Sequence, residues 1–353
     1  MEKDGFPVRI KDMTLSSLER FFEEIGEERY RARQVARWVF KKGACSFDEM
    51  TDLPRDLRDR LSKVLEIGSL SVLEKRVSRR KGAVKYLFGL SDGQAVEAVF
   101  LKYSYGNAVC VSTQVGCRMG CALCASGIDG FIRHLRPGEI YDQVLGVQRD
   151  TCQRITHVVL MGCGEPLDNY SSTLTFIRNV IAPYALNLSP RRITVSTCGL
   201  VPQIRRLAGE GLPVTLAVSL HAPDDRTRNA LVPVNKKYPI GELMAACRHY
   251  YHTTGRRVTF EYALISGVND SRRHAEKLGQ LLSGFPCHVN LIPANPVPEK
   301  GVEGVPRQKA EHFKRVVESY GIPVTVRREL GSDIEAACGQ LRRKVAYAPE
   351  GRQ

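Results

Sequence analysis

The chain has 353 residues, 11 cysteines and a formal net charge of +14. No apolar run of about 18 residues is present, which excludes a membrane-spanning helix, and the charged start of the chain lacks the apolar core of a signal peptide. Irregularly spaced cysteines, odd in number, argue against a secreted disulfide framework, so we expect a cytoplasmic protein. The positive charge suits a polyanionic partner, although a merely basic surface would give the same balance.

Residues 1–65 have the apolar spacing of helices. Leu15, Leu18 and Phe22 recur at helical intervals, a second helix is expected over 32–39, and Pro54 is placed to open a third. The second helix carries basic side chains opposite its apolar face, namely Arg31, Arg33, Arg37, Lys41 and Lys42. This pattern suits an accessory domain that grips a substrate; the alternative is a solvated face that only packs on its neighbour.

Residues 66–102 change to a period of two, which predicts a small antiparallel β extension. Its strands are expected at 71–78, 83–90 and 95–103, with a Ser-Asp-Gly hairpin turn at 91–93. Glu97 lies in the last of these strands. On the sequence alone it is an ordinary strand carboxylate.

Strand and helix signals alternate over residues 103–328. Six strands are predicted, at 108–113, 156–162, 192–197, 213–220, 257–265 and 288–293. Six βα units predict a parallel sheet with right-handed crossovers, and they are too few for an eight-stranded barrel. The expected fold class is therefore α/β, a partial (β/α)6 barrel with its ligand site at the carboxyl ends of the strands.

A C-x3-C-x2-C run, Cys117, Cys121 and Cys124, follows the first of these strands. Three thiolates this close can bind three irons of a cubane cluster and leave the fourth iron open to a small molecule. Gly116 and Gly120 give the loop the backbone freedom to wrap a cluster. A structural zinc site would need a distant fourth ligand, and the spacing leaves that alternative open.

Polar or glycine-containing segments follow other strands of the predicted barrel, at 162–166, 196–199, 219–221 and 292–296. Because the carboxyl ends of parallel strands meet at one rim, these segments are expected to line one site. The C-terminal segment, 329–353, ends in a basic run and contains Cys338 between Ala337 and Gly339. A structural cysteine in a tight turn is the simpler interpretation of Cys338.

Together these segments resemble the radical S-adenosylmethionine (SAM) enzymes, and among them the RlmN/Cfr-type RNA adenine methyltransferases. The resemblance covers nearly the whole chain, and its strongest motifs are CVSTQVGCRMGCALC, GEPLDN, VSTCGLVP, AVSLHAP, IPANP and GSDIEAACGQL. The segment RARQVARWVFKKGACSFDEMTDLP resembles the small RNA-binding domain of this family. The resemblance implies an RNA-binding accessory domain at 1–65, a barrel of the radical SAM type at 103–328, and a C-terminal loop that carries a methyl-carrier cysteine.

The resemblance also implies the roles of individual residues. The ligands of a [4Fe-4S] cluster would be Cys117, Cys121 and Cys124. The pocket for SAM would be lined by Gly164, Glu165, Ser196, Ser219, Leu220, His221 and Asn295, the first two holding the methionyl part. Cys338 would carry a methyl group, Cys110 would be its disulfide partner, and Glu97 would accept a proton.

The chemistry explains why such an enzyme needs a carrier cysteine. C2 of adenine lies between two ring nitrogens and is too electron-poor to attack the methyl group of a sulfonium, whereas a thiolate takes that methyl group readily. The resemblance implies two SAM molecules per turnover, one to methylate Cys338 and one to activate the S-methyl group. The activated carbon would add to C2, and Cys110 would release the transient protein–RNA crosslink by forming a disulfide.

The implied substrates are adenosine 2503 of 23S ribosomal RNA and adenosine 37 of some tRNAs. A flavodoxin or ferredoxin would donate electrons, and we expect a monomer without a membrane partner. The alternatives are methylation of C8 of the same adenosine, a radical enzyme that acts on a peptide or small molecule, and a zinc-stabilised RNA-binding protein without catalysis.

Overall fold

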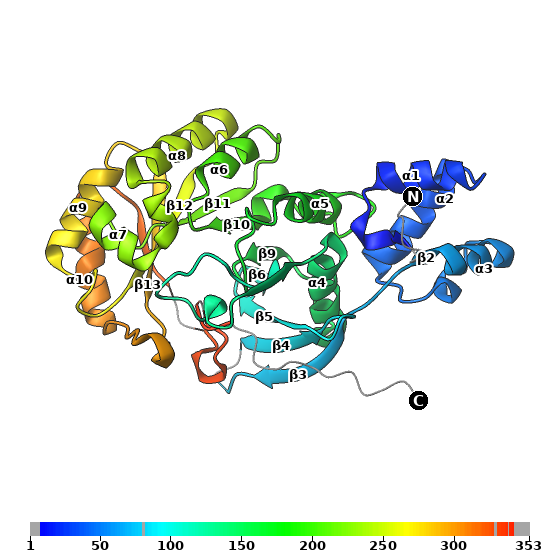
Figure 1. Cartoon of the computed structure of the whole chain (residues 1–353), viewed down its shortest axis with the longest axis horizontal. Coiled ribbons are helices and arrows are strands. Elements are labelled where there is room, and N and C mark those ends of the chain that lie inside the picture. Colours follow the sequence, from blue (N-terminus) through cyan, green and yellow to red (C-terminus); the bar gives the residue numbers. More distant parts are fainter. Residues whose placement is uncertain (1–7, 80–81, 328–329, 338, 342–353) are drawn as a thin grey trace.

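A single large sheet organises the molecule (Figure 1). The computed structural model describes residues 8–79, 82–327, 330–337 and 339–341. The ten strands of the sheet lie in the order β14-β13-β12-β11-β10-β9-β6-β5-β4-β3. Their bounds are β3 (Ser71–Val77), β4 (Ala83–Gly89), β5 (Ala95–Tyr103), β6 (Gly106–Cys110), β9 (His157–Leu160), β10 (Ile193–Thr197), β11 (Thr215–Ser219), β12 (Val258–Leu264), β13 (Cys287–Pro293) and β14 (Val324–Val326).

Within this sheet, β6 and the strands from β9 to β14 run parallel, and they include all six predicted barrel strands. The α/β class with a mostly parallel, open sheet is therefore confirmed. The additional parallel strand, β14, was not predicted, because three residues are too few for a periodic pattern. The predicted antiparallel strands form β3, β4 and β5, and β5 pairs with β6, so they extend the barrel sheet instead of forming a sheet of their own.

Helices from the βα units cover the outer face of the parallel strands (Figure 1). Their bounds are α4 (Pro137–Thr151), α5 (Tyr170–Ile181), α6 (Val201–Ala208), α7 (Asp225–Leu231), α8 (Ile240–Thr254), α9 (Arg272–Leu282) and α10 (Arg307–Glu318). Within β10, Ile193 and Val195 are buried while Thr194 and Ser196 are partly exposed. The outward side chains are thus apolar and pack on the helices, which leaves polar groups on the concave face.

The N-terminal residues form a helical unit of α1 (Leu15–Glu24), α2 (Arg29–Ala36) and α3 (Arg55–Val64), closed by the short pair β1 (Val8–Arg9) and β2 (Leu65–Glu66). Pro54 is the N-cap of α3 rather than its first residue. The unit is joined to α4 by a buried ion pair between Lys11 and Asp142 and by a 2.9 Å hydrogen bond from Tyr141 Oη to the carbonyl of Phe40. The unit therefore packs on the barrel through polar as well as apolar contacts.

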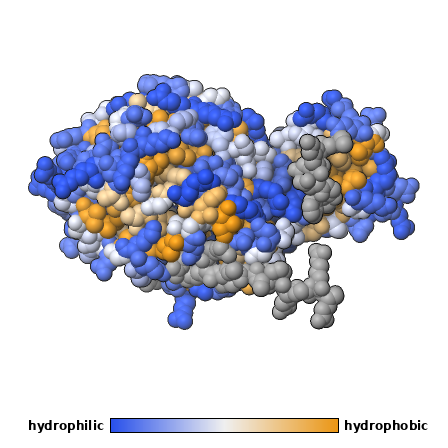
Figure 2. Space-filling model, in the orientation of Figure 1, coloured by the Kyte–Doolittle hydropathy of each residue, from blue (hydrophilic) through white to orange (hydrophobic). Residues whose placement is uncertain are grey.

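Hydrophobic side chains on the face shown in Figure 2 gather over the middle of the larger part of the molecule, and hydrophilic groups surround them. No helix among the described residues combines the length and the apolar character that a membrane crossing requires.

Candidate active site

A cavity at the carboxyl ends of the parallel strands brings most of the predicted site residues together. We call it the cysteine cavity. The predicted residues that line it are Cys117, Cys121, Cys124, Gly164, Glu165, Ser196, Ser219, His221 and Asn295. They come from the carboxyl ends of β10 and β11 and from segments that follow β6, β9, β11 and β13, as the strand-end rule predicts.

The cysteine loop is held between the short strands β7 (Gln114–Gly116) and β8 (Phe131–His134). Gly116 has a φ of +74°, and a Cβ atom there would lie 1.8 Å from the carbonyl oxygen of Gly130. Only glycine fits this approach of two backbones. The glycine fixes the point at which the chain leaves β7 and turns toward the cavity.

The three loop cysteines suit a cluster with one thiolate on each of three irons. Burial raises the pKa of the Cys117 thiol to about 11 and that of Cys121 to about 12, and the neighbouring Cys124 sulfur adds to both shifts. Such thiols ionise only beside a strong positive charge, which a metal centre supplies. Among the described residues, no group of three or more His, Cys, Asp or Glu side chains could hold one metal ion.

Glu165 is a buried carboxylate that ties two strand ends together. Oε1 accepts a 3.0 Å hydrogen bond from the backbone N–H of Leu167, and Oε2 accepts one of 2.8 Å from that of Cys198. Burial raises the pKa of Glu165, and these donors oppose the rise. The carboxylate thus shapes the rim. The preceding Gly164 has a φ of +106°, and an added Cβ atom there would lie 2.6 Å from Gln114 Cβ, so a larger residue would collide with Gln114.

His221 lines the cysteine cavity, whereas the adjacent Leu220 does not. His221 has a φ of +57°, and its Nδ1 accepts a 3.0 Å hydrogen bond from the backbone N–H of Ala263. Burial lowers the pKa of His221 to about 3, and Arg228 adds to the shift, so the ring is neutral with its proton on Nε2. Leu220 is fully buried in the hydrophobic core and does not line the cysteine cavity, so its side chain is not where the predicted role would need it.

Arg228 of α7 is fully buried and is not among the residues predicted from the sequence. Its guanidinium donates hydrogen bonds to the carbonyls of Leu220 (3.0 Å), Cys198 (2.6 Å) and Ser219 (3.0 Å). It therefore fastens the ends of β10 and β11 to each other behind the cavity. Nothing in the sequence distinguishes it from the surface arginines, because its role depends on tertiary contacts.

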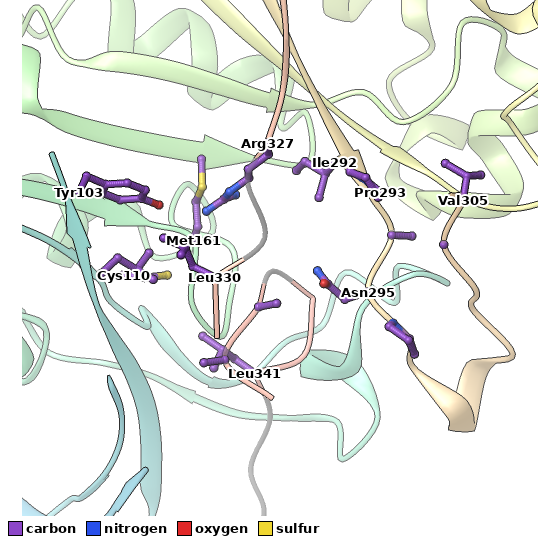
Figure 3. Close-up of a pocket in the computed structure, with 16 residues that line it drawn as sticks. Tyr103, Cys110, Met161, Ile292, Pro293, Asn295, Val305, Arg327, Leu330 and Leu341 are labelled. Atoms are coloured by element: carbon purple, nitrogen blue, oxygen red, sulfur yellow. The ribbon is translucent and has the colours of Figure 1, made fainter. Parts of the chain in front are cut away.

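A second cavity adjoins the first and contains Cys110. We call it the Cys110 cavity; Figure 3 shows Cys110, Met161, Asn295 and Arg327 around it. Met161, Asn295 and Arg327 also line the cysteine cavity.

Cys338 lies outside the described residues. Its chain neighbours are described: Ala337 lines the Cys110 cavity and Gly339 lines the cysteine cavity.

Glu97 is buried in β5 and forms an ion pair with Lys85 of β4, with 2.6 Å between Lys85 Nζ and Glu97 Oε1. Lys85 Nζ also donates a 3.0 Å hydrogen bond to the carbonyl of Glu335, in the C-terminal segment. Glu97 lines neither cavity, but its strand neighbour Val99 pairs with Cys110. The Glu97–Lys85 pair thus contacts the segment that precedes Cys338.

Two family models match the chain. Residues 8–67 match the ribosomal RNA large subunit methyltransferase N-terminal domain, and residues 111–278 match the radical SAM superfamily. The first match coincides with the helical unit, and the second spans the cysteine loop and the strands from β9 to β12.

Proteins similar to this chain carry consistent names. It is 64% identical over 355 residues to a probable dual-specificity RNA methyltransferase RlmN of Pelotomaculum thermopropionicum, across 99% of this chain and 96% of that protein. It is 54% identical to a protein of the same name from Desulforamulus reducens, across 96% of each. A radical SAM methyltransferase from Sphaerobacter thermophilus has a similar structure, with a TM-score of 0.91 and 46% identity, across 95% of this chain and 99% of that one.

Proposed function

Because the chain belongs to the RlmN family of radical SAM RNA methyltransferases, we propose that it methylates C2 of adenosine in 23S ribosomal RNA and in tRNA. The observation that carries this proposal is the adjacency of the two cavities. Cys110 lines one of them, the cluster cysteines line the other, and the neighbours of Cys338 line one each. Two thiols beside a SAM site are what C2 chemistry requires. Family membership also rules out the alternative of a zinc-stabilised protein without catalysis.

The family uses a [4Fe-4S] cluster and SAM. We assign the cluster to Cys117, Cys121 and Cys124, and SAM to the polar rim of the cysteine cavity. When bound, these groups supply the methyl group and an organic radical that activates it. The polar lining comes from backbone of the Gly164–Glu165 turn and from the side chains of Ser196, Ser219, His221 and Asn295.

The chain's own residues then do the group transfer. The thiolate of Cys338 accepts the methyl group, and the activated carbon on its sulfur bonds to C2 of the base. Glu97 takes the ring proton. Its ion pair with Lys85 keeps the Glu97 carboxylate negatively charged before that transfer. The adduct gives up its unpaired electron to the electron-transfer partner. The Cys110 thiolate then attacks the sulfur of Cys338, and the electron pair of the broken carbon–sulfur bond takes up a proton, so that the carbon becomes the methyl group. The disulfide that remains must be reset by an external reductant. We propose two SAM molecules per cycle, a flavodoxin or ferredoxin as electron donor, and a monomer.

Nucleoside mass spectrometry tests the proposed reaction. The anaerobically reconstituted protein is incubated with unmodified 23S ribosomal RNA and with tRNA, and each RNA is digested and analysed separately. We expect 2-methyladenosine in both digests. If 8-methyladenosine forms instead, the site acts on C8; if neither RNA gains a methyl group, the proposed function is wrong.

A further inference from the structure

A third cavity lies at the opposite end of the barrel, where the parallel strands begin. Its lining includes Thr194, Thr215 and Thr259, near the amino ends of β10, β11 and β12, together with Tyr103 and Tyr105. We call it the tyrosine cavity. Met161 and Arg327 line this cavity, the Cys110 cavity and the cysteine cavity alike. The three cavities therefore adjoin one another along the concave face of the sheet.

Aromatic rings stand at the outer end of the tyrosine cavity. The rings of Tyr103 and Tyr105 stack, with centroids 4.9 Å apart and planes 7° from parallel, and the ring of His157 meets Tyr105 edge-on at 5.4 Å. Tyr105 is 67% exposed, the largest value among the exposed large hydrophobic residues of the described chain. A ring supported on one face and open on the other is a surface on which a nucleobase can stack.

Basic side chains stand beside these rings. Arg191 and Arg192 line the tyrosine cavity and are exposed, and Arg154 shares a neighbouring hollow with them. None of these arginines forms an ion pair with a described carboxylate, whereas Arg33, Arg60 and Arg178 elsewhere on the surface each pair with a glutamate. Unpaired arginines next to exposed aromatic rings are the combination that binds single-stranded nucleic acid.

The carboxyl end of the barrel is covered by two loops. The backbone N–H of Ala125, just after the cluster cysteines, donates a 2.8 Å hydrogen bond to the carbonyl of Gly339, and Ser126 Oγ donates one of 2.7 Å to the carbonyl of Leu341. The cysteine loop and the C-terminal segment therefore close on each other over the cysteine cavity, and Figure 1 shows them side by side. The tyrosine cavity lies away from these loops, at the end where the strands begin.

We propose that the RNA substrate enters the barrel through the tyrosine cavity, with a base next to the target adenosine stacked on Tyr105 and phosphates bound by Arg191 and Arg192. The proposal rests on the proposed function, since it takes RNA as the substrate. It adds the route and the residues that hold the strand. The target base passes Tyr103 and Met161 to reach the Cys110 cavity, while SAM binds from the other side.

A matched pair of charge variants tests the phosphate contacts. R191Q/R192Q removes two charges at the tyrosine cavity, and R205Q/R206Q removes two exposed charges from the outer helix α6. Binding of a short fluorescein-labelled single-stranded RNA with one adenosine is followed by anisotropy over a range of salt. We expect R191Q/R192Q to bind roughly tenfold more weakly, with a slope of log K against log salt that is flatter by about 1.4. Equal losses in both variants, or no loss in R191Q/R192Q, overturn the proposal.

A second pair of variants tests stacking. We expect Tyr105→Ala to weaken binding of the same RNA roughly five- to a hundredfold and Tyr105→Phe to bind like the native protein, because the phenylalanine ring still stacks. Iron content and SAM binding should stay unchanged in both. If native protein forms 2-methyladenosine but Tyr105→Ala binds RNA normally, the entry route is wrong and the proposed function stands. If no methylated adenosine forms although the binding losses appear, the proposed function is wrong and the route stands.

Discussion

Lys85 and Glu97 form the most completely buried ion pair of the described site, with side chains 5% and 4% exposed. A charge buried this deeply is stable only while its partner is present. Lys85 also holds the carbonyl of Glu335, so the pair joins the proposed proton acceptor to the C-terminal segment. We expect the pair to affect stability and, through the proposed proton acceptor, turnover, and substitutions can separate the two effects.

We predict that Lys85→Met lowers the free energy of unfolding by about 3 to 5 kcal/mol, because it leaves a buried carboxylate without its counter-ion. The double variant K85M/E97L should recover most of this loss, since two apolar side chains replace the two charges. Urea denaturation measures both. If Glu97 is the proton acceptor, the double variant is folded but does not methylate RNA. Normal turnover in that variant would remove Glu97 from the mechanism.

The buried His221 makes stability depend on pH. Its pKa in the folded protein is about 3, below the ordinary value of 6.5, because burial and Arg228 disfavour the charged ring. The unfolded chain therefore binds one more proton in this range, and the stability that the neutral ring provides is lost as pH falls below about 6.5.

We predict that the free energy of unfolding of the native protein falls more steeply with acid than that of His221→Gln, by about 1.4 kcal/mol per pH unit between pH 6 and 5. Denaturant titrations at several pH values measure the difference. His249→Gln, at an exposed position of α8, is the control for the loss of a histidine from the surface. Parallel curves for native protein and His221→Gln would show that His221 is charged or accessible in the folded state.

At the scale of residues, the sequence predicted which side chains gather at the rim but not how they are used. Most lie in the cysteine cavity, since strand ends determine their position. The exception, Leu220, points into the core because strand residues alternate between the two faces of a sheet. Arg228 and Lys85 could not be predicted, because a buried charge is recognised only from the partners that the fold brings to it.

Among the elements, the cysteine loop is the one whose shape the proposed function depends on most directly. Two of its glycines have positive φ, +74° at Gly116 and +66° at Gly120, but their surroundings differ. An added Cβ at Gly116 would collide with the carbonyl oxygen of Gly130, whereas one at Gly120 would meet nothing within 4 Å. A substitution at Gly116 therefore tests a steric collision together with backbone strain, whereas one at Gly120 tests backbone strain alone.

We predict that Gly116→Ala loses most of its iron, because the loop must move away from β8 and its thiols no longer converge. Gly120→Ala should keep its iron and lose only about 1 to 2 kcal/mol of stability from the left-handed conformation. Iron per chain after anaerobic reconstitution measures the difference. Full iron in Gly116→Ala would mean that the loop tolerates another path, and the loop geometry would not be what positions the cluster.

Helices and strands with a clear period of apolar residues were predictable from the sequence. Short strands, and strands that form only because a neighbour pairs with them, were not. Strands such as β12 and β13, seven residues each, carry enough alternation to be recognised. β7 and β14 have three residues each and depend on their neighbours. The pairing of β5 with β6 was also not predictable, because local sequence patterns do not encode which strands pair with each other.

In the molecule as a whole, the helical unit presents its own basic surface. Arg37, Lys41 and Lys42 are exposed on the π-helical turn that continues α2, and none pairs with a described carboxylate. We propose this unit as an accessory RNA-binding domain. Deleting it would expose the face of α4 that Phe40 and Lys11 cover, so substitution of surface charges is the sharper test.

We predict that R37Q/K41Q/K42Q flattens the slope of log K against log salt for ribosomal RNA by about 2 to 3. The control, R272Q/R273Q/R307Q, removes the same charge from α9 and α10, at the far end of the molecule from the helical unit (Figure 1). Filter binding over a range of salt measures both. An unchanged slope in the first variant, or equal changes in the two, would show that the helical unit does not bind phosphates.

In the proposed mechanism, two cysteines pass one carbon to C2 of adenosine. Cys110→Ala removes the thiol that would release the crosslink but leaves the carrier, Cys338. We predict that this variant, isolated after incubation with RNA and SAM, carries covalently bound RNA that survives denaturation. Cys338→Ala and the double variant should carry none, because no bond to RNA can form without the carrier.

Mass spectrometry of the Cys110→Ala protein after nuclease and protease digestion is the most direct measurement. We expect an adenosine joined through one methylene carbon to the peptide that contains Cys338, with the bond at C2 of the base. Normal turnover by Cys110→Ala, or RNA that denaturation alone removes, would contradict the two-cysteine mechanism in this protein.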